Sequence, residues 1–178
     1  EEEPLTFAHL EATEEFLTAS NSPVQGKNLS LSERIRLRLV TTCLTHSRPY
    51  TLPFREDRFY FDPAEFRLLF PESVVRWMMQ TGQAHSVEIT PKEGRPFRVY
   101  PLPEHGHLPV VVAVRMSLSM PIILSAVNLY CQDRVHPDNP LEKTIFTDGG
   151  IVSNFPIHFF DEFVPRYPTF GLNLIFAP

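Results

Sequence analysis

The residues with the clearest chemical potential form one short run near the end of the chain, Asp148-Gly149-Gly150. They follow residues 143–147, whose composition predicts a short strand, so the carboxylate of Asp148 is expected on a sharp turn at the sheet edge. The two glycines would permit a positive φ angle or a close approach of the backbone. Sites in α/β sheets tend to lie at such strand ends. The alternative is an Asx turn, in which the carboxylate only accepts a hydrogen bond from its own backbone.

A second motif lies about thirty residues upstream and has the form Arg115-x-Ser117-x-Ser119-x-Pro121. Either serine is a candidate nucleophile by residue type. Neither has the flanking glycines that build the strained elbow of a catalytic serine. We therefore predict that both serines cap a helix or bond backbone near the break at Pro121. We expect Arg115 to form a structural ion pair with a carboxylate.

The seven histidines suggest other chemistry without completing a site. His105 and His107 have a spacing that could touch one metal ion, but Glu104 is the one acidic neighbour, so a solvated loop is the favoured interpretation. His46 would line a cleft or sit satisfied at a strand end. His158 could complete a Ser–His–Asp triad with the aspartate, which is the less favoured arrangement. No metal and no cofactor are expected.

The elements that would position these residues alternate along the chain, which favours an α/β domain with a mixed sheet flanked by helices. Strands are predicted over 36–44, 50–54, 58–61, 122–130, 143–147 and 169–176. Helices are predicted over 8–19 with Thr6 as cap, 63–70 with Asp62 as cap, 72–81, from 110 onward, and 154–163. The valine-rich start at 110–114 would also suit a buried strand. Residues 82–108 are expected to be an irregular surface excursion.

Composition excludes several classes of protein. The chain has 178 residues, 43% hydrophobic and 21% charged, as an ordinary globular domain has. Its net charge of −5 argues against nucleic acid and against electrostatic attachment to anionic lipid. The longest apolar stretch, 120–131, is about half of the roughly 20 residues that span a bilayer. Cys43 and Cys131 are expected to be buried, reduced thiols, and the expected setting is cytoplasmic.

The two motifs taken together, R-x-S-x-S-x-P and D-G-G-x-x-x-N-x-P, resemble the second half of the patatin-like phospholipase family. Further stretches are similar to its bacterial members, so the resemblance covers nearly the whole chain: 4–7, 41–45, 48–54 and 169–174. The resemblance implies a three-layer α/β domain of which this chain is the C-terminal part. It also implies a lipid or other acyl ester substrate, and contact with a membrane surface through the parent protein.

The resemblance further implies a Ser–Asp dyad in which Asp148 is the base that activates a serine directly. Gly149 and Gly150 would shape the turn. Asn154 and Pro156 would cap and begin the following helix, which are structural roles.

The chain departs from the family pattern in one respect. None of its seven glycines frames a serine as G-x-S-x-G, and no glycine-rich oxyanion loop is present in the sequence. Since both elements precede this region in the family, we expect residues 31–178 to be the C-terminal half of the domain. Residues 1–30 would be a helix and a flexible or lid-like segment. Without the missing N-terminal half the chain is expected to be inactive; the alternative is a non-catalytic, protein-binding scaffold.

Overall fold

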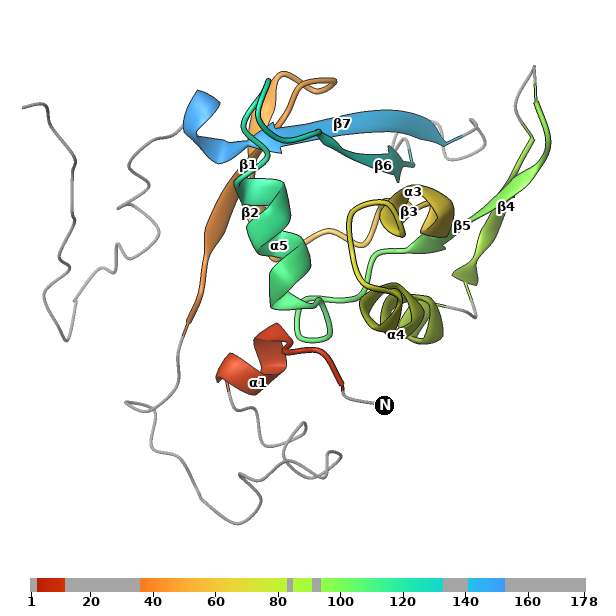
Figure 1. Cartoon of the computed structure of the whole chain (residues 1–178), viewed down its shortest axis with the longest axis horizontal. Helices are drawn as coiled ribbons and strands as arrows, with labels where there is room; N and C mark the ends of the chain where they lie inside the picture. The colour runs from red at the N-terminus through yellow and green to blue at the C-terminus, as the bar shows by residue number, and fades with distance from the viewer. Residues whose placement is uncertain (1–2, 12–35, 83–84, 91–93, 133–140, 153–178) are drawn as a thin grey trace, which may run out of the picture.

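A computed structural model describes residues 3–11, 36–82, 85–90, 94–132 and 141–152. Seven strands form one sheet in the order β2-β1-β7-β6-β3-β5-β4 (Figure 1). They are β1 (Leu39–Cys43), β2 (Arg48–Leu52), β3 (Phe59–Phe61), β4 (Val87–Ile89), β5 (Phe97–Pro101), β6 (Val127–Cys131) and β7 (Glu142–Asp148). The helices are α1 (Phe7–Glu11), α3 (Pro63–Phe66), α4 (Glu72–Gly82), α5 (Val110–Ser117) and the 3₁₀ turn η3 (Gly149–Ile151).

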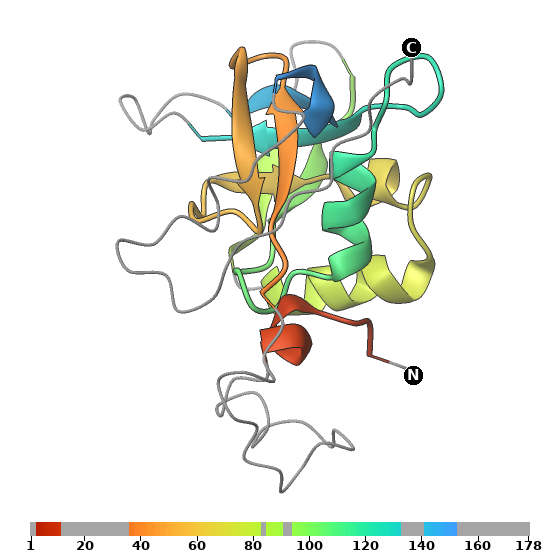
Figure 2. The ribbon, with the colours of Figure 1, turned by 90° about the vertical axis from the view of Figure 1, so that its left-hand side faces the viewer.

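The expected α/β class is confirmed, and the structure refines its details. All pairings between the described strands are antiparallel, where a mixed sheet was expected. Helices α1, α3, α4 and α5 all contribute side chains to one core cluster. In Figures 1 and 2 the sheet curls around them, and α5 lies alongside β1. The predicted helix 154–163 and strand 169–176 lie outside the described residues.

Local sequence signals account for most element boundaries. Asp62 caps α3 as predicted, because its Oδ1 accepts a hydrogen bond from Ala64 N at 2.8 Å and Pro63 follows it. The helix ends at Phe66 rather than near Phe70, and a turn completes the segment. The apolar segment at 110 is a helix and not a strand, because burial of Val112, Ala113 and Met116 follows helical spacing.

Two predictions of local structure were wrong. The segment 82–108 is not only an irregular excursion, since β4 and β5 form a hairpin whose inner strand pairs with β3. Burial of Val99 anchors this hairpin, whereas the Gly, Pro and His around it obscured the strand pattern. The strand expected over 122–130 begins at Val127, because the backbone first turns at Ile122, where φ is 77°.

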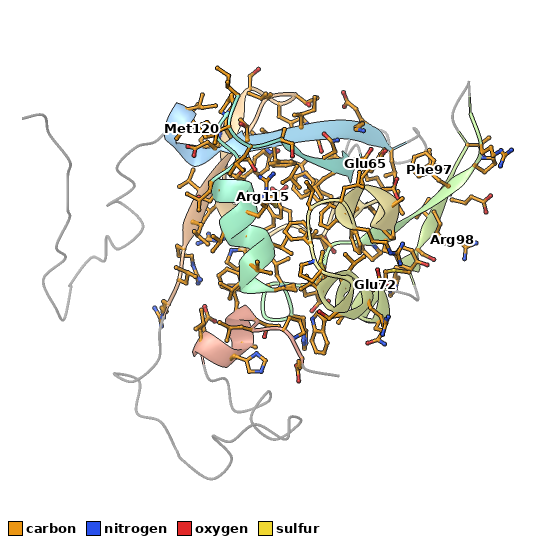
Figure 3. The ribbon with its side chains drawn as sticks, viewed as in Figure 1. Glu65, Glu72, Phe97, Arg98, Arg115 and Met120 are labelled. Carbon is orange, nitrogen blue, oxygen red and sulfur yellow. The ribbon has the colours of Figure 1, made fainter. Side chains whose placement is uncertain are left out.

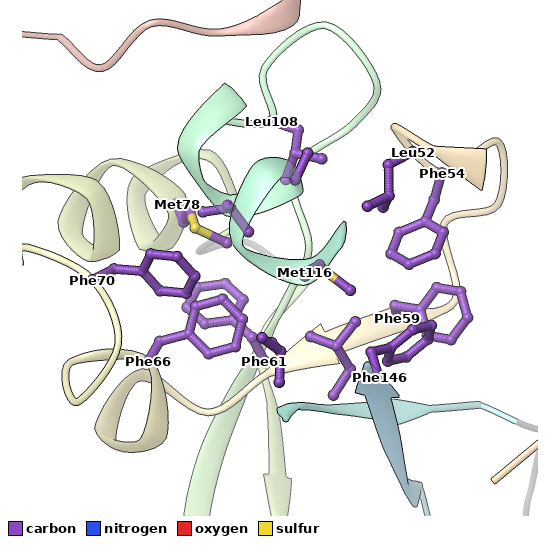
Figure 4. Close-up of a cluster of buried hydrophobic side chains, with 14 of the residues drawn as sticks. Leu52, Phe54, Phe59, Phe61, Phe66, Phe70, Met78, Leu108, Met116 and Phe146 are labelled. Carbon is purple, nitrogen blue, oxygen red and sulfur yellow. The ribbon is translucent and has the colours of Figure 1, made fainter. Parts of the chain in front are cut away.

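The core between the sheet and the helices is rich in aromatic rings (Figure 4). Phe146 on β7 packs edge-on against Phe59, with ring centroids 5.4 Å apart, and against Phe54 at 5.6 Å. Phe59 and Phe54 lie 4.5 Å apart. Tyr50 closes this group, 5.7 Å from Phe146. The aromatic group thus ties β7, the strand that ends at Asp148, to β2 and β3.

Replacement of Phe146 by alanine should lower the free energy of unfolding by about 3–5 kcal/mol, because a fully buried ring is removed from close-packed neighbours. Urea unfolding followed by circular dichroism measures the change. Leu68→Ala is the matched control, because the Leu68 side chain is 84% exposed and should change stability by no more than about 0.5 kcal/mol. Equal effects at both positions would contradict the packing described here.

Candidate active site

Asp148 ends β7 and caps the turn η3 that follows. Its Oδ1 accepts a hydrogen bond from Gly150 N at 2.5 Å, which is the Asx-turn interaction. The side chain is half-buried. Among the described residues, its other oxygen, Oδ2, accepts no hydrogen bond. One oxygen of the carboxylate is therefore held by the backbone, and no donor in the described part of the chain reaches the other.

Gly149 is required by close approach to a neighbouring strand. A Cβ atom built on Gly149 would lie 2.2 Å from the carbonyl oxygen of Val40 on β1 and 2.7 Å from its carbonyl carbon. Neither Gly149 nor Gly150 has a positive φ angle. Of the two roles predicted for the glycines, close backbone approach is the one that the structure supports at Gly149.

The backbone of Asp148 is bound by groups from two other parts of the chain. Its N–H donates to Ser119 O at 3.1 Å, and its carbonyl accepts from Thr42 Oγ1 at 2.8 Å. Thr147 Oγ1 also donates to Ser119 O, at 2.7 Å. On the adjacent strand, Thr41 Oγ1 donates to Thr147 O at 2.8 Å. These buried hydroxyl groups replace water as partners of the backbone and so fix the end of the strand that carries the aspartate.

The sequence motif around Arg115 forms the support beneath this turn. Ser119 Oγ donates to the carbonyl of Arg115 at 2.6 Å and contacts its guanidinium. The other side of the guanidinium donates to Ser125 O at 2.8 Å. Among the described residues, Arg115 donates to these two serines, and the expected ion pair with a carboxylate stays a prediction. Ser117 is half-buried on the last turn of α5, and Pro121 is exposed in the following turn.

The hydroxyl of Ser119 is bound within its own turn of backbone rather than presented to Asp148. This bonding supports the structural interpretation of that serine. Asn154, Pro156 and His158 lie outside the described residues. The sequence reasoning missed the threonines of β1 and β7, and its available signal was the polar but β-branched pair Thr41-Thr42 within an otherwise apolar strand.

The histidines hold local structure in the described residues. The loop at His105 is not merely solvated as expected, because Gly106 O accepts from Ala8 N at 2.8 Å and His105 Nε2 lies 3.6 Å from Glu11. This loop therefore docks α1. Among the described residues, no group of three or more His, Cys, Asp or Glu side chains could hold a metal ion.

With this geometry established, the sequence was compared with known proteins. The sequence model described as patatin-like phospholipase matches residues 7–161. The chain belongs to this family. It is 32% identical to the RpoH suppressor of Rhizobium meliloti (strain 1021), over 98% of this chain and 31% of that relative. The chain thus spans about a third of the length of this relative. No solved structure matches significantly.

The family match covers most of the residues that the structure describes. The matched region includes the β7 strand, the Asp148 turn and the supporting motif at Arg115. In the described part of the chain, no helix is long and apolar enough to cross a membrane.

A polar cluster at the opposite end of β1 includes a histidine that titrates. His46 Nδ1 lies 2.7 Å from the hydroxyl of Tyr50, which also accepts from Arg48 at 2.7 Å and from Arg58 at 2.8 Å. A hydroxyl that accepts two bonds donates its own proton to the third partner, so His46 Nδ1 is the acceptor. Burial, followed by the charges of Arg58 and Arg48, lowers the pKa of His46 below 6.5.

Replacement of Gly149 by alanine should destabilise the domain by at least about 1–3 kcal/mol, because the added Cβ meets backbone that cannot rotate away. Gly106→Ala is the matched control, since its Cβ would lie an ordinary 3.4 Å from the side chain of Ala8. Thermal unfolding of both variants measures the difference. A Gly149→Ala variant as stable as Gly106→Ala would refute the close approach of η3 to β1.

The stability of the domain should fall with pH below 6.5, partly through His46. Well above that pH His46 is neutral in both states, and its contribution is complete. As pH falls toward the lowered pKa, the unfolded state takes up a proton that the folded state does not, so stability is lost. His46→Gln should reduce this loss, measured as urea midpoints at pH 7.5 and 5.5. An unchanged pH dependence would show that His46 does not contribute.

Proposed function

We propose that this chain supplies the general base of a patatin-like lipid acyl hydrolase, and that the base is Asp148. The proposal rests on the difference in hydrogen bonding between the two carboxylate oxygens of Asp148. Oδ1 is held by Gly150 N, while Oδ2 has no hydrogen-bond partner among the described residues. A base that receives a proton during the reaction needs a fixed orientation and one free oxygen, and this arrangement offers both.

The proposed reaction needs no histidine. Asp148 Oδ2 accepts the proton of a serine hydroxyl as the serine oxygen attacks the ester carbonyl. The tetrahedral intermediate collapses to an acyl-enzyme, and the leaving alcohol takes up the proton. Water then attacks the acyl-enzyme with the same carboxylate as base, which releases the fatty acid and restores the serine.

The serine and the oxyanion donors of this reaction would come from outside the present sequence, which has no G-x-S-x-G. The activity is thus proposed for the parent protein, and the chain alone is proposed to be inactive. We extend the proposal to a cytoplasmic setting with access to a membrane surface, since Cys43 and Cys131 are free and buried. The second candidate function, a non-catalytic protein-binding scaffold, is favoured by the same absence of a nucleophile.

The Asx turn allows the catalytic and structural roles of Asp148 to be separated. An asparagine at 148 can still accept the hydrogen bond from Gly150 N but is not a base, whereas alanine loses both roles. In the parent protein, Asp148→Asn should lower kcat for p-nitrophenyl butyrate by about 10²–10⁴-fold. Its melting temperature should stay close to wild type. Asp148→Ala should lose the same activity and also about 1 kcal/mol of stability.

Glu142→Gln is the matched control, because it makes the same acid-to-amide change at the exposed start of β7 and should leave kcat unchanged. The chain is also assayed alone and mixed with the upstream part of the domain. Activity in the mixture that Asp148→Asn abolishes would support the dyad. Full activity of the Asp148→Asn parent would refute it, and an inactive but folded parent protein would favour the scaffold.

A further inference from the structure

The guanidinium group of Arg115, in the last turn of α5, joins the two ends of the turn at residues 119–125. Its Nη1 donates to Ser119 Oγ. Its Nη2 donates to Ser125 O at 2.8 Å and to Ser125 Oγ at 3.0 Å. Figure 3 shows Arg115 on α5 and Met120 beyond the end of that helix. One planar group therefore holds the base of the turn at two points.

Ser119 is the residue of this turn that contacts the strand of the aspartate. Its carbonyl oxygen accepts from Asp148 N at 3.1 Å and from Thr147 Oγ1 at 2.7 Å. Its hydroxyl accepts from the guanidinium of Arg115 and donates to Arg115 O at 2.6 Å. Ser119 is fully buried, so water does not compete for these bonds. The residue therefore connects Arg115 to the backbone of Asp148.

Strand β7 depends on this contact because its pairing with β6 ends before the aspartate. In the ladder between β6 and β7, the pair nearest to Asp148 is Val127 with Phe146. Asp148 N donates instead to the carbonyl of Ser119, which lies in a turn and not in a strand. A strand is held in place by its neighbours in the sheet. The position of this turn depends on the groups that hold its two ends, and Arg115 binds both.

The bonds of Arg115 go beyond those of a cation at a helix C-terminus. Any basic side chain in the last turn of a helix interacts favourably with the free carbonyl groups there, and lysine can do so as well as arginine. The link between Ser119 and Ser125 needs several donors in a fixed planar arrangement. A guanidinium group has them, whereas an ammonium group is a single point charge. A role in charge and a role in geometry can therefore be separated by substitution.

We propose that Arg115 is a positioning residue for the base. Its guanidinium holds Ser119 in the place where the serine carbonyl fixes the backbone of Asp148, and so keeps the carboxylate in the orientation that proton transfer requires. The inference rests on the proposed function, because it takes Asp148 to be the base. A displacement of about 1 Å can cost on the order of 10²-fold in rate, so loss of this link should slow the chemical step.

The first test is Arg115→Lys in the parent protein, which keeps the charge and removes the two-point link. With p-nitrophenyl butyrate, kcat should fall about 10–100-fold. The ratio kcat/KM should fall by the same factor and KM should not change, because binding of the ester is not affected. Arg67→Lys is the matched control, since Arg67 also binds through two nitrogens, to Glu72 at 2.8 and 3.3 Å, and Figure 3 shows Glu72 away from Arg115. This control should leave kcat unchanged.

Ser119→Ala is the second variant. It keeps the carbonyl that Asp148 uses and removes the hydroxyl that Arg115 binds. The value of kcat should again fall, and the double variant of Arg115→Lys with Ser119→Ala should be no slower than the slower single variant, because both remove one link. In an Asp148→Asn background, Arg115→Lys should not lower the residual rate further, because Arg115 acts only through the carboxylate.

Hydrogen–deuterium exchange in the parent protein tests the link without any measurement of activity. In Arg115→Lys, the amide of Asp148 should exchange about tenfold faster, because the charge-assisted hydrogen bonds of the guanidinium no longer oppose local opening. Mass spectrometry of overlapping peptides isolates this amide. The amides of β3 should exchange as in wild type, which distinguishes local release of the strand end from a general loss of stability.

Full kcat in Arg115→Lys would overturn the proposal, because charge alone would then be sufficient, as in the ion pair predicted for Arg115. Unchanged exchange at Asp148, or equal acceleration throughout β3, would overturn it as well. An inactive Asp148→Asn beside a fully active Arg115→Lys would refute only the positioning role. A fully active Asp148→Asn would refute the dyad, and this inference with it. The two failures are therefore distinguishable.

Discussion

The contact between Gly149 and Val40 is the constraint on which the site depends. Strand β7 pairs with β1 up to Asp148, and η3 then turns directly over the backbone of β1. Any side chain at 149 would occupy the space of the Val40 carbonyl group. Because this contact is backbone against backbone, no rotamer change can relieve it. The direction in which Asp148 leaves the sheet is therefore set by the absence of a single Cβ atom.

Around this contact, buried hydroxyl groups take the place that nonpolar side chains have elsewhere in the core. Thr41 and Thr42 donate to backbone carbonyls at the end of β7, and Thr147 donates to the carbonyl of Ser119, after α5. Each satisfies a polar group that burial would otherwise leave unpaired. Further along β7, Phe146 joins the aromatic cluster of the core. The strand thus changes from nonpolar packing to hydrogen bonding within two residues, which gives a rigid base and a polar tip.

The Asp148 turn is compatible with both a structural and a catalytic role, which the sequence analysis treated as alternatives. Asp148 forms the Asx turn that a purely structural role requires, and among the described residues its Oδ2 has no hydrogen-bond partner, as the proposed catalytic role requires. The motif at Arg115 has a comparable double use. Arg115 and Ser119 support the turn from below, and the same backbone continues into the exposed residues 120–124. The support and the carboxylate are consequently parts of one connected structure.

Much of this arrangement was determined by the sequence alone. Several local signals predicted it without coordinates. These are the Asp62-Pro63 cap, the helical spacing of α5, the burial of both cysteines and the family motifs. The hairpin of β4 and β5 could not be predicted from the sequence, because its strands are short and the hairpin is fixed by the pairing of β5 with β3.

Tertiary structure alone decided the rest of the site. Whether the glycines after Asp148 served positive φ angles or close approach depended on Val40, more than one hundred residues away in the sequence. The partners of Arg115 depended on where the chain turned back toward Ser125. Sequence determines which residues can pack or bond, and long-range contacts determine which of them do.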